Sequence, residues 1–391
     1  MSVEVVSLGC RMNLAESEKM RALLADEQDM VVINSCAVTA EAVRQTRQAI
    51  RRARKARPDA RLMVTGCAVE VEREAMSALG VDGLIDGLIP NADKLDPRSW
   101  NVPAAPLVVP SGQHTRAFVA VQNGCDHACT FCIIPAGRGP SRSRSAAEVV
   151  AEVRAHVDQG VMEVVLTAVD LTGWTRDDRR LGDLVAAILR DVPELPRLRL
   201  SSLDGVEIDP LLREIIAGEA RVMPHLHLSL QHGADLILKR MKRRHSRADA
   251  VELVADLTAR RPDIAVGADL IAGFPTEGEA EHTDNLSIIE ALSIVHGHIF
   301  PFSPRATTPA ARMPQLPRPV ITQRAAELRA AVADQRARWM VAQIGRPQRV
   351  LAERDGTGHA ENFARIALPP GIAAGRIIAI TPTHLSEGLL A

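Results

Sequence analysis

The chain has six cysteines, the residues best suited to chemistry here, and their spacing divides them into two groups. Three of them, Cys125, Cys129 and Cys132, lie close together as C-x3-C-x2-C and are called the barrel-loop cysteines below. The N-terminal cysteines, Cys10, Cys36 and Cys67, are far apart in the chain. Nothing in the sequence marks the chain for an oxidising compartment, so clustered cysteines favour metal binding or redox chemistry over disulfides.

Three closely spaced thiolates suit an iron–sulfur cluster better than a structural zinc ion. They can hold three irons of a [4Fe–4S] cluster and leave the fourth iron open, whereas structural zinc normally takes four ligands. No fourth cysteine lies nearby, and His127, inside the motif, has poor geometry for the same ion. A zinc site or an incidental group of thiols stays open as the alternative.

The N-terminal cysteines each follow a short apolar run that is typical of a buried strand. These runs are VEVVSL before Cys10, MVVINS before Cys36 and RLMVTG before Cys67. A helical pattern follows each cysteine; Asn13 is expected to cap the first helix, and residues 40–57 predict a long second one. Alternating strands and helices predict a parallel sheet, whose strand ends meet at one edge. We therefore expect the three thiols to converge on a metal or cluster site.

The remainder of the chain predicts a second α/β unit and a small tail. Six strand candidates, mostly separated by helices, suit an open parallel barrel with its chemistry at the carboxyl ends of the strands. They span residues 117–122, 163–169, 197–202, 225–230, 265–271 and 293–300. A stretch with three prolines at 101–112 is typical of a linker, and 321–342 predicts a terminal helix. Later residues show short strand-like runs between turns, which suit a small β-barrel.

The predicted fold class is therefore α/β, with three domains. These are an N-terminal parallel α/β domain (1–103), a partial (βα)6 barrel (113–342) and a small C-terminal β-barrel (343–391). The chain has 391 residues, 46% hydrophobic and 24% charged, so it can bury a core. No apolar run approaches the roughly 20 residues of a membrane helix, and the first residues do not resemble a signal peptide. We expect a cytoplasmic protein without membrane contact; the net charge of −1 excludes no partner.

A C-x3-C-x2-C motif on the first strand of a six-unit barrel resembles that of radical S-adenosylmethionine (SAM) enzymes. Over nearly its full length the chain is similar to the radical SAM methylthiotransferase family, whose C-terminal domain is an RNA-binding barrel of the TRAM type. Within the family it looks like the branch that acts on threonylcarbamoyladenosine in tRNA. Where Arg11 stands, the isopentenyladenosine branch has Gln and the ribosomal-protein branch has Pro. The segments that carry the resemblance are LGCRMNLAESE (8–18), NSCAVTAEAVRQTRQAIRRA (34–53), QNGCDHACTFCIIP (122–135), LTAVDLT (166–172), RLSSLDGVEID (199–209), LSLQHGADLILKRMKRRHSR (228–247) and GADLIAGFPTE (267–277).

The resemblance implies two [4Fe–4S] clusters, one on each group of cysteines, and SAM as a cofactor. It implies that the barrel cluster supplies the electron that cleaves SAM, and that the resulting deoxyadenosyl radical removes hydrogen from C2 of adenine 37. The N-terminal cluster is implied to carry the sulfur that a second SAM methylates before transfer. The implied partners are tRNA, a flavodoxin- or ferredoxin-like electron donor and a sulfur source.

Polar residues near the carboxyl ends of the predicted barrel strands are candidates for SAM contacts, with helix capping as the alternative. They are Asp170, Ser202, Gln231 and Asp269. Basic residues are candidate substrate contacts, with a solvated basic face as the alternative. They are Arg11, Arg47, Arg51, Lys242 and Arg243. His225 and His227 alternate with leucines on one strand and are expected to pack inward rather than bind a metal.

Three other functions stay open. The same chemistry could act on a ribosomal-protein aspartate or on isopentenyladenosine in tRNA. The chain could also be an RNA-binding iron–sulfur protein without turnover. The last is suggested by alanines that stand where the family commonly has larger residues, or glycine in the last case: Ala68, Ala128, Ala136 and Ala168.

Overall fold

The apolar runs before the N-terminal cysteines form the centre of a parallel sheet in the computed structural model, which describes residues 3–104 and 115–391. Strands β1 (Glu4–Ser7), β2 (Met30–Ser35), β3 (Arg61–Gly66) and β4 (Gly87–Leu88) pair in that order, all parallel. Helix α1 (Arg11–Leu23) packs on one face of the sheet, and α2 (Ala40–Ala56) and α4 (Arg73–Val81) pack on the other. The predicted strands and their parallel arrangement are confirmed.

The predicted cap of the first helix is wrong. Helix α1 begins at Arg11 with Cys10 as its N-cap, so Asn13 lies inside the first turn. The buried Asn13 amide instead donates to the carbonyls of Leu8, at 2.7 Å, and Ser35, at 2.9 Å. Asn13 therefore ties the loop after β1 to the end of β2, which fixes the backbone on both sides of Cys10.

The middle unit contains the six predicted strands. They are β5 (Ala117–Asn123), β7 (Glu163–Ala168), β8 (Arg197–Leu200), β9 (His225–Gln231), β10 (Ala265–Ala272) and β11 (Ile294–Pro301). Strands β5, β7 and β8 pair in parallel, as do β9, β10 and β11, and a bridge from Leu203 to Leu228 joins the two groups. Among the described residues β5 and β11 do not pair, so the barrel is open between them. A short strand, β6 (Arg142–Ser143), runs antiparallel to β5.

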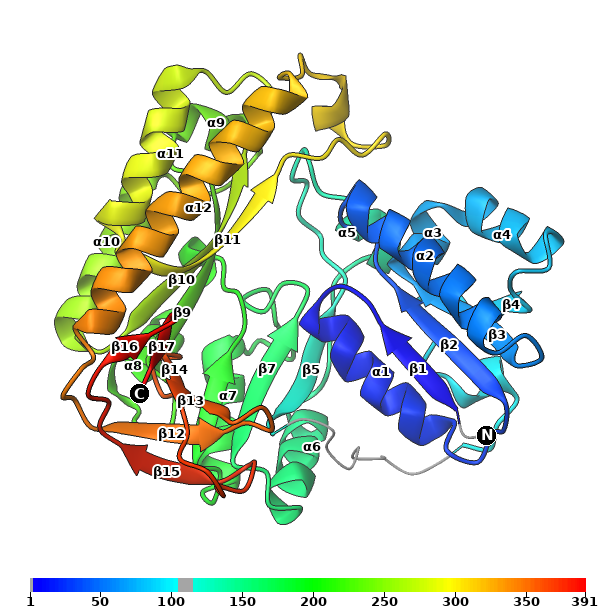
Figure 1. The fold of residues 1–391 in the computed structure, drawn as a ribbon, viewed down its shortest axis with the longest axis horizontal. Helices are drawn as coiled ribbons and strands as arrows, with labels where there is room; N and C mark the ends of the chain where they lie inside the picture. Colours follow the sequence, from blue (N-terminus) through cyan, green and yellow to red (C-terminus); the bar gives the residue numbers. More distant parts are fainter. Residues whose placement is uncertain (1–2, 105–114) are drawn as a thin grey trace.

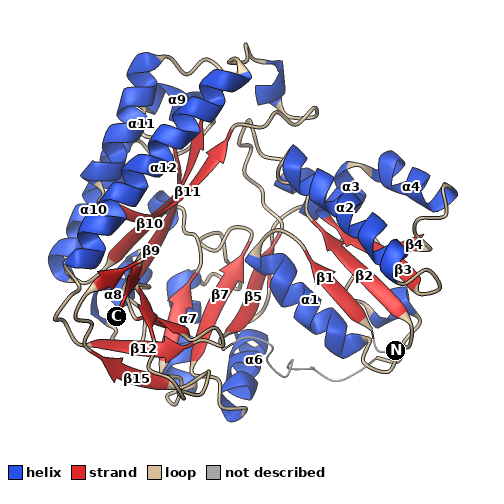
Figure 2. Ribbon diagram, viewed as in Figure 1, coloured by secondary structure: helices blue, strands red, loops and turns tan. Residues whose placement is uncertain are grey.

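Helices cover the outside of these strands (Figures 1 and 2). They are α6 (Ala146–Asp158), α7 (Leu181–Asp191), α8 (Pro210–Gly218), α9 (Asp235–Arg240), α10 (Arg247–Arg260), α11 (Glu279–Ala291) and α12 (Arg318–Val341). Val119, Leu166 and Leu198 of the strands pack with Val153 and Leu184 of the helices in one apolar core. Helices α6 and α10 begin with capping boxes at Ser145 and Ser246, which satisfy the free amides of their first turns.

The C-terminal unit is rich in β-structure. It contains β12 (Gln348–Ala352), β13 (Thr357–Ala360), β14 (Arg365–Ala367), β15 (Ile377–Ile380), β16 (Leu385–Ser386) and β17 (Leu389–Leu390). They form one sheet in the order β15-β12-β13-β14-β17-β16, and no pairing among the described residues closes it into a barrel. Val350, Ile366 and Leu390 form its core with Met340 of α12. The core contact with α12 attaches this unit to the barrel.

The predicted linker at 101–112 falls mostly on residues 105–114, which lie outside the described residues. The division at 103 and 113 therefore remains a proposal, together with the boundary at 342. No helix in the described part of the chain is both long enough and apolar enough to cross a membrane.

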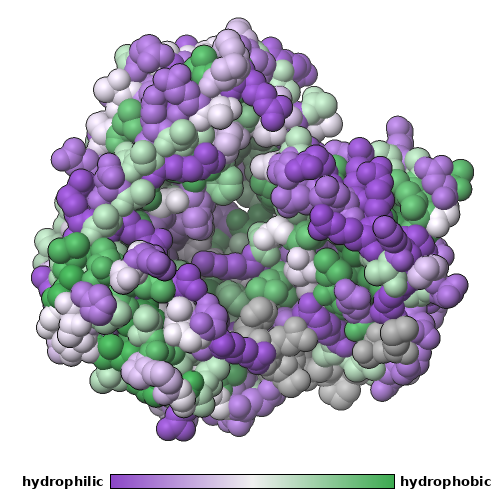
Figure 3. All heavy atoms as spheres, viewed as in Figure 1, coloured by the Kyte–Doolittle hydropathy of each residue, from purple (hydrophilic) through white to green (hydrophobic). Residues whose placement is uncertain are grey.

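The three units meet around a hollow at the centre of the molecule (Figure 3). Hydrophilic residues line the hollow on the face shown. Lys19 of α1 forms an ion pair with Glu152 of α6 at 2.8 Å, which links the N-terminal unit to the barrel. Arg197 of β8 donates to the carbonyl of Arg349 at 2.8 Å, which links the barrel to the C-terminal unit.

Candidate active site

The barrel-loop cysteines lie together in the loop after β5. The Cys125 amide donates to the carbonyl of Gly139 at 3.1 Å, and the Cys132 amide donates to that of Cys129 at 3.2 Å. Gly124 has a φ of +78°, and a Cβ there would lie 1.9 Å from the carbonyl oxygen of Pro140. The residue before Cys125 must therefore be glycine, because the loop returns against its backbone.

The three thiols are close enough to influence one another. Burial raises the pKa of Cys125 to about 12, and the thiols of Cys132 and Cys129 contribute to the rise. The His127 amide donates to the Cys125 sulfur at 3.4 Å, and the Arg243 guanidinium lies 3.7 Å from the Cys129 sulfur. An amide and a guanidinium directed at sulfur favour thiolates, which are the form that binds iron.

His127 is held by carboxylates. Its Nε2 lies 2.8 Å from Asp170 and 3.5 Å from Glu207. Hydrogen bonds to Asp170 and then Glu207 raise the pKa of His127 to about 10, so the ring is protonated at neutral pH. Arg244 pairs with the same Glu207 at 2.7 Å. A protonated imidazole has no free lone pair for a metal, so in this state His127 is an ion-pair partner of the two carboxylates.

Three of the four predicted SAM contacts lie at the carboxyl end of the barrel strands, where the barrel-loop cysteines also lie. Asp170 follows β7, and its amide donates to the side chain of Gln122 at 3.0 Å. Ser202 follows β8, and Gln231 ends β9 with a φ of +71°. Asp269 does not lie there, because β10 continues to Ala272 and leaves Asp269 in the middle of the strand.

The N-terminal cysteines follow β1, β2 and β3 and also come together. Because β1, β2 and β3 are adjacent and parallel, all three cysteines follow the same sheet edge. Burial raises the pKa of Cys36, and the thiols of Cys10 and Cys67 raise it further. Gly9 has a φ of +90°, and a Cβ there would lie 2.6 Å from the Cys36 sulfur. This glycine lets the loop after β1 approach the loop after β2. The three cysteines therefore lie at one sheet edge, and their convergence on one metal or cluster site stays a prediction.

A buried ion network joins the two groups of cysteines. Arg138, on α5 (Ile134–Arg138), donates to both carboxylate oxygens of Glu16, at 2.8 and 3.0 Å, and to Asn13 at 2.6 Å. Lys94 also pairs with Glu16, at 2.5 Å. Burial raises the pKa of Cys67, and the charges of Arg138 and Lys94 oppose that rise. The peptide that holds the barrel-loop cysteines thus also places a cation beside the N-terminal ones.

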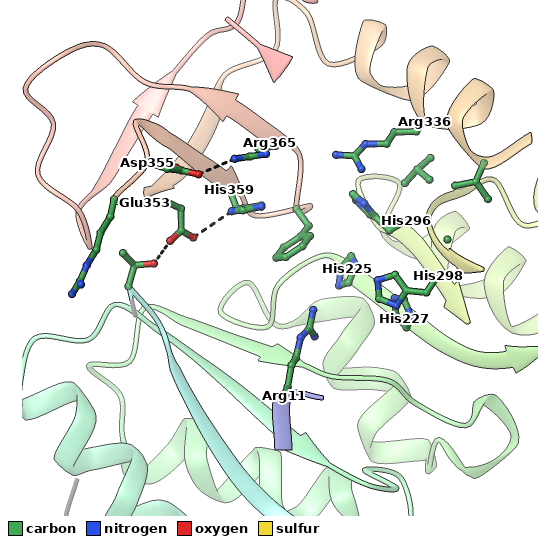
Figure 4. Close-up of a pocket in the computed structure, with 16 residues that line it drawn as sticks. Arg11, His225, His227, His296, His298, Arg336, Glu353, Asp355, His359 and Arg365 are labelled. Carbon is green, nitrogen blue, oxygen red and sulfur yellow. Dashed lines mark hydrogen bonds and ion pairs between the residues drawn. The ribbon is translucent and has the colours of Figure 1, made fainter. Parts of the chain in front are cut away.

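A cavity of about 720 Å³ lies between the three units (Figure 4). Arg11 reaches it from the start of α1, directly after Cys10, and histidines line it from β9 and β11. Arg336 of α12 and the C-terminal residues Glu353, His359 and Phe363 complete its walls. Burial lowers the pKa of Arg11, Arg116 and Arg199 add to the effect, and the carboxylates of Asp269 and Glu163 oppose it. The cavity is suited to a polar ligand that carries negative charge.

Comparison with known proteins gives matches along the whole chain. The model described as the radical SAM superfamily matches residues 119–286, and that described as uncharacterized protein family UPF0004 matches residues 2–85. The threonylcarbamoyladenosine tRNA methylthiotransferase MtaB of Rickettsia prowazekii is 40% identical over 99% of this chain and 96% of its own length. The chain belongs to the radical SAM methylthiotransferase family.

Other members of the family are more distant. A protein of Aquifex aeolicus with the same name is 30% identical over 97% of this chain and 100% of its own. A tRNA-2-methylthio-N(6)-dimethylallyladenosine synthase of Cereibacter sphaeroides is 33% identical over 90% of this chain and 87% of its own. The structure of TsrM, a radical SAM methyltransferase of Kitasatospora setae, shares the fold with a TM-score of 0.55 at 16% identity, covering 80% of this chain and 74% of that one.

As a radical SAM methylthiotransferase, the enzyme uses SAM and a [4Fe–4S] cluster. The barrel loop fits such a cluster, because it offers three free thiols at one place with hydrogen-bond donors directed at two of the sulfurs. Asp170 and Gln231 lie at the same end of the barrel and could contact SAM. These assignments rest on donor chemistry and position.

The basic residues predicted to contact substrate are placed differently from one another. Arg51 and Lys242 are exposed, and Arg47 pairs with Glu72 at 3.0 Å. Arg243 does not fit a contact with tRNA phosphates, because its side chain is only 7% exposed and pairs with Asp204 at 2.9 Å. The sequence shows a basic run, but it does not show that Asp204 lies beneath it.

Sequence reasoning missed Arg138 and His298. Arg138 stands in a short Gly- and Pro-containing segment that gives no sign of a buried ion pair with a residue 122 positions away. His298 shares Asp269 with His227, at 3.1 Å in each case. The strand candidate at 293–300 contains two histidines in alternation, as the strand at 225–230 does, and this repeated pattern could have indicated a common wall.

Proposed function

We propose that this enzyme adds a methylthio group to C2 of N6-threonylcarbamoyladenosine at position 37 of tRNA. The observation that carries the proposal is the position of Arg11, whose side chain enters a cation-rich cavity while its backbone neighbour is Cys10. A carboxylate-bearing substrate held by Arg11 would lie beside the N-terminal cysteines. The relatives from Rickettsia prowazekii and Aquifex aeolicus, which are named for this substrate, support the same conclusion.

The proposal includes a second [4Fe–4S] cluster on the N-terminal cysteines. Their donor set is the same as that of the barrel loop, and the cation of Arg138 beside them favours thiolates. When bound, the clusters and SAM supply the radical chemistry that an unactivated C–H bond requires, and the sulfur that replaces the hydrogen. Asp170, Ser202 and Gln231 remain the proposed SAM contacts, whereas Asp269 lies in the middle of β10, where His227 and His298 hold its carboxylate.

The residues of the chain bind and orient the substrate. A bidentate contact between Arg11 and the threonylcarbamoyl carboxylate is charge-assisted and contributes on the order of 1.5–3 kcal/mol. Burial and the neighbouring cations Arg116 and Arg199 disfavour the charged form of Arg11, and an anionic substrate would oppose that effect. Arg51 and Lys242, which are exposed, are proposed contacts for tRNA phosphates, and Arg47 would exchange Glu72 for a phosphate.

The test is mass spectrometry of tRNA nucleosides. Anaerobically reconstituted protein, with SAM, a sulfide source and a flavodoxin- or ferredoxin-like reductant, is incubated with tRNA that carries threonylcarbamoyladenosine or isopentenyladenosine. We expect the 2-methylthio product from the first tRNA and little from the second. Product from isopentenyladenosine alone would refute the proposed substrate, and SAM cleavage without product from either would refute the proposed tRNA activity.

A further inference from the structure

His225 is buried without a hydrogen-bond partner. It begins β9, is 9% exposed and lines the cavity, and neither of its ring nitrogens has a partner among the residues that the structure describes. Burial holds the pKa of His225 well below its usual value, and His296 and Arg199 add to this effect, so the ring is neutral. A buried polar group without a partner costs about 1–3 kcal/mol, so two such nitrogens at a cavity wall point to a ligand.

The neighbouring histidines divide into two that Asp269 anchors and one, His296, whose Nε2 has no partner among the described residues. His227 and His298 each lie 3.1 Å from the same oxygen of Asp269. Gly267 permits this arrangement, because a Cβ at that position would lie 2.4 Å from Nδ1 of His227. His296, whose ring centroid is 5.3 Å from that of His225, has a buried Nε2 without a partner in the described chain. Figure 4 shows the histidines gathered on one wall, with Arg11 directed toward them.

An aromatic surface stands beside this wall. Phe363 has a φ of +70°, a conformation that is strained for a bulky residue and persists only where its surroundings enforce it. Its ring stacks on His359 with centroids 4.5 Å apart and lies 5.1 Å from the ring of His225. A planar surface next to unpaired ring nitrogens fits a nucleobase that carries a polar substituent.

We infer that His225, together with His296, recognises the polar N6 substituent of the substrate adenine and thereby selects threonylcarbamoyl over isopentenyl. A neutral imidazole offers one N–H donor and one acceptor, and the ureido, hydroxyl and carboxylate groups of threonylcarbamoyl offer partners for both. An isopentenyl group offers none, so its binding would leave the ring nitrogens desolvated and unpaired. This inference rests on the proposed function and assigns its substrate choice to named residues.

The experiment measures equilibrium binding of the full-length reconstituted protein to three anticodon stem-loops of one sequence. Their position 37 carries threonylcarbamoyladenosine, isopentenyladenosine or adenosine. We expect the wild-type protein to bind the first at least about tenfold more tightly than the second, which corresponds to about 1.4 kcal/mol. His225→Phe and His296→Phe, made singly, should each reduce this ratio severalfold, and His225→Gln should retain most of it.

The matched control is His156→Phe. His156 is also buried, but it lies on α6 and does not line the cavity, so its replacement should leave the binding ratio unchanged. If the wild-type protein prefers the isopentenyl stem-loop, the proposed function itself fails. If it prefers the threonylcarbamoyl stem-loop and the folded His296→Phe protein keeps the full ratio, the proposed function stands and the inference is overturned. His296 is only half-buried, so this variant tests the inference even where His225→Phe does not fold.

Discussion

Replacing Arg138 with methionine should uncouple the N-terminal unit from the barrel. The Arg138 side chain is fully buried and is the centre of a network that joins α5 to α1. Its loss removes two hydrogen bonds to Glu16, one to Asn13 and one to Asn123. The variant should therefore still cleave SAM to deoxyadenosine in the barrel, while methylthio transfer falls because the N-terminal cysteines are no longer held against it.

The loss of folding stability in Arg138→Met follows from the buried charge of Glu16, which loses one of its partners. Removing one partner of a buried ion pair costs about 3–5 kcal/mol, because the other charge stays buried without compensation. Lys94 still pairs with Glu16 at 2.5 Å in the variant, so we expect the low end of this range, about 3 kcal/mol. The double variant Glu16→Gln/Arg138→Met should lose less stability than the two single variants lose together. Each single change leaves a buried charge that the other change removes.

The assay combines urea unfolding with product analysis. The midpoint of the first unfolding transition reports the network, and the ratio of methylthio product to deoxyadenosine reports the coupling. Arg44→Met is the control, because Arg44 also pairs with a carboxylate, Glu41 at 2.6 Å, but both groups are exposed and the midpoint should not move. Additive effects in the double variant, or an unchanged product ratio in Arg138→Met, would refute the reasoning.

The other predictions concern the clusters and the substrate. Reconstituted wild-type protein should hold about eight irons. Replacing all three barrel-loop cysteines with alanine should halve the iron content and abolish the formation of deoxyadenosine. A protein that holds a single zinc ion and no iron would refute both cluster sites. Alanine at all three N-terminal cysteines should leave SAM cleavage intact and remove the methylthio product, so loss of both activities in a folded protein would contradict the separate roles. Arg11→Gln should lower turnover of threonylcarbamoyladenosine tRNA by roughly 10- to 150-fold, the equivalent of a charge-assisted contact, and lower uncoupled SAM cleavage far less. Full tRNA turnover by this variant would show that Arg11 does not contact the substrate.

Much of the fold could be predicted from the sequence because its strands are buried and regularly followed by helices. Parallel strands covered on both faces are continuous apolar runs, and each run before a cysteine forms a strand that ends within three residues of it. The topology then brings Cys10, Cys36 and Cys67 to one edge without further information. The same logic placed Asp170 and Gln231 at the carboxyl end of the barrel.

The errors arise where a side chain depends on distant partners. Arg243 belongs to a basic run that predicts a contact with tRNA phosphates or else a solvated face, yet its side chain is buried against Asp204 and lies 3.7 Å from the Cys129 sulfur. Asp269 lies inside the strand predicted at 265–271, and the sequence does not show that His227 and His298 share its carboxylate. His225 was expected to pack inward, and it does. A strand pattern cannot show, however, that neither of its ring nitrogens has a partner among the described residues.

The cavity also links recognition of the base to docking of the C-terminal unit. Arg197 and Arg199 of β8 donate to backbone carbonyls of that unit, at Arg349 and Glu361. Arg199 also lies 4.8 Å from the ring of Phe363, which is a cation–π contact that holds the aromatic surface in place. A change that loosens the C-terminal unit therefore displaces Glu353, His359 and Phe363, which form one wall of the cavity. In the proposed function, Arg197 and Arg199 therefore act on base selection indirectly, because they hold in place the C-terminal residues that line the cavity next to Arg11.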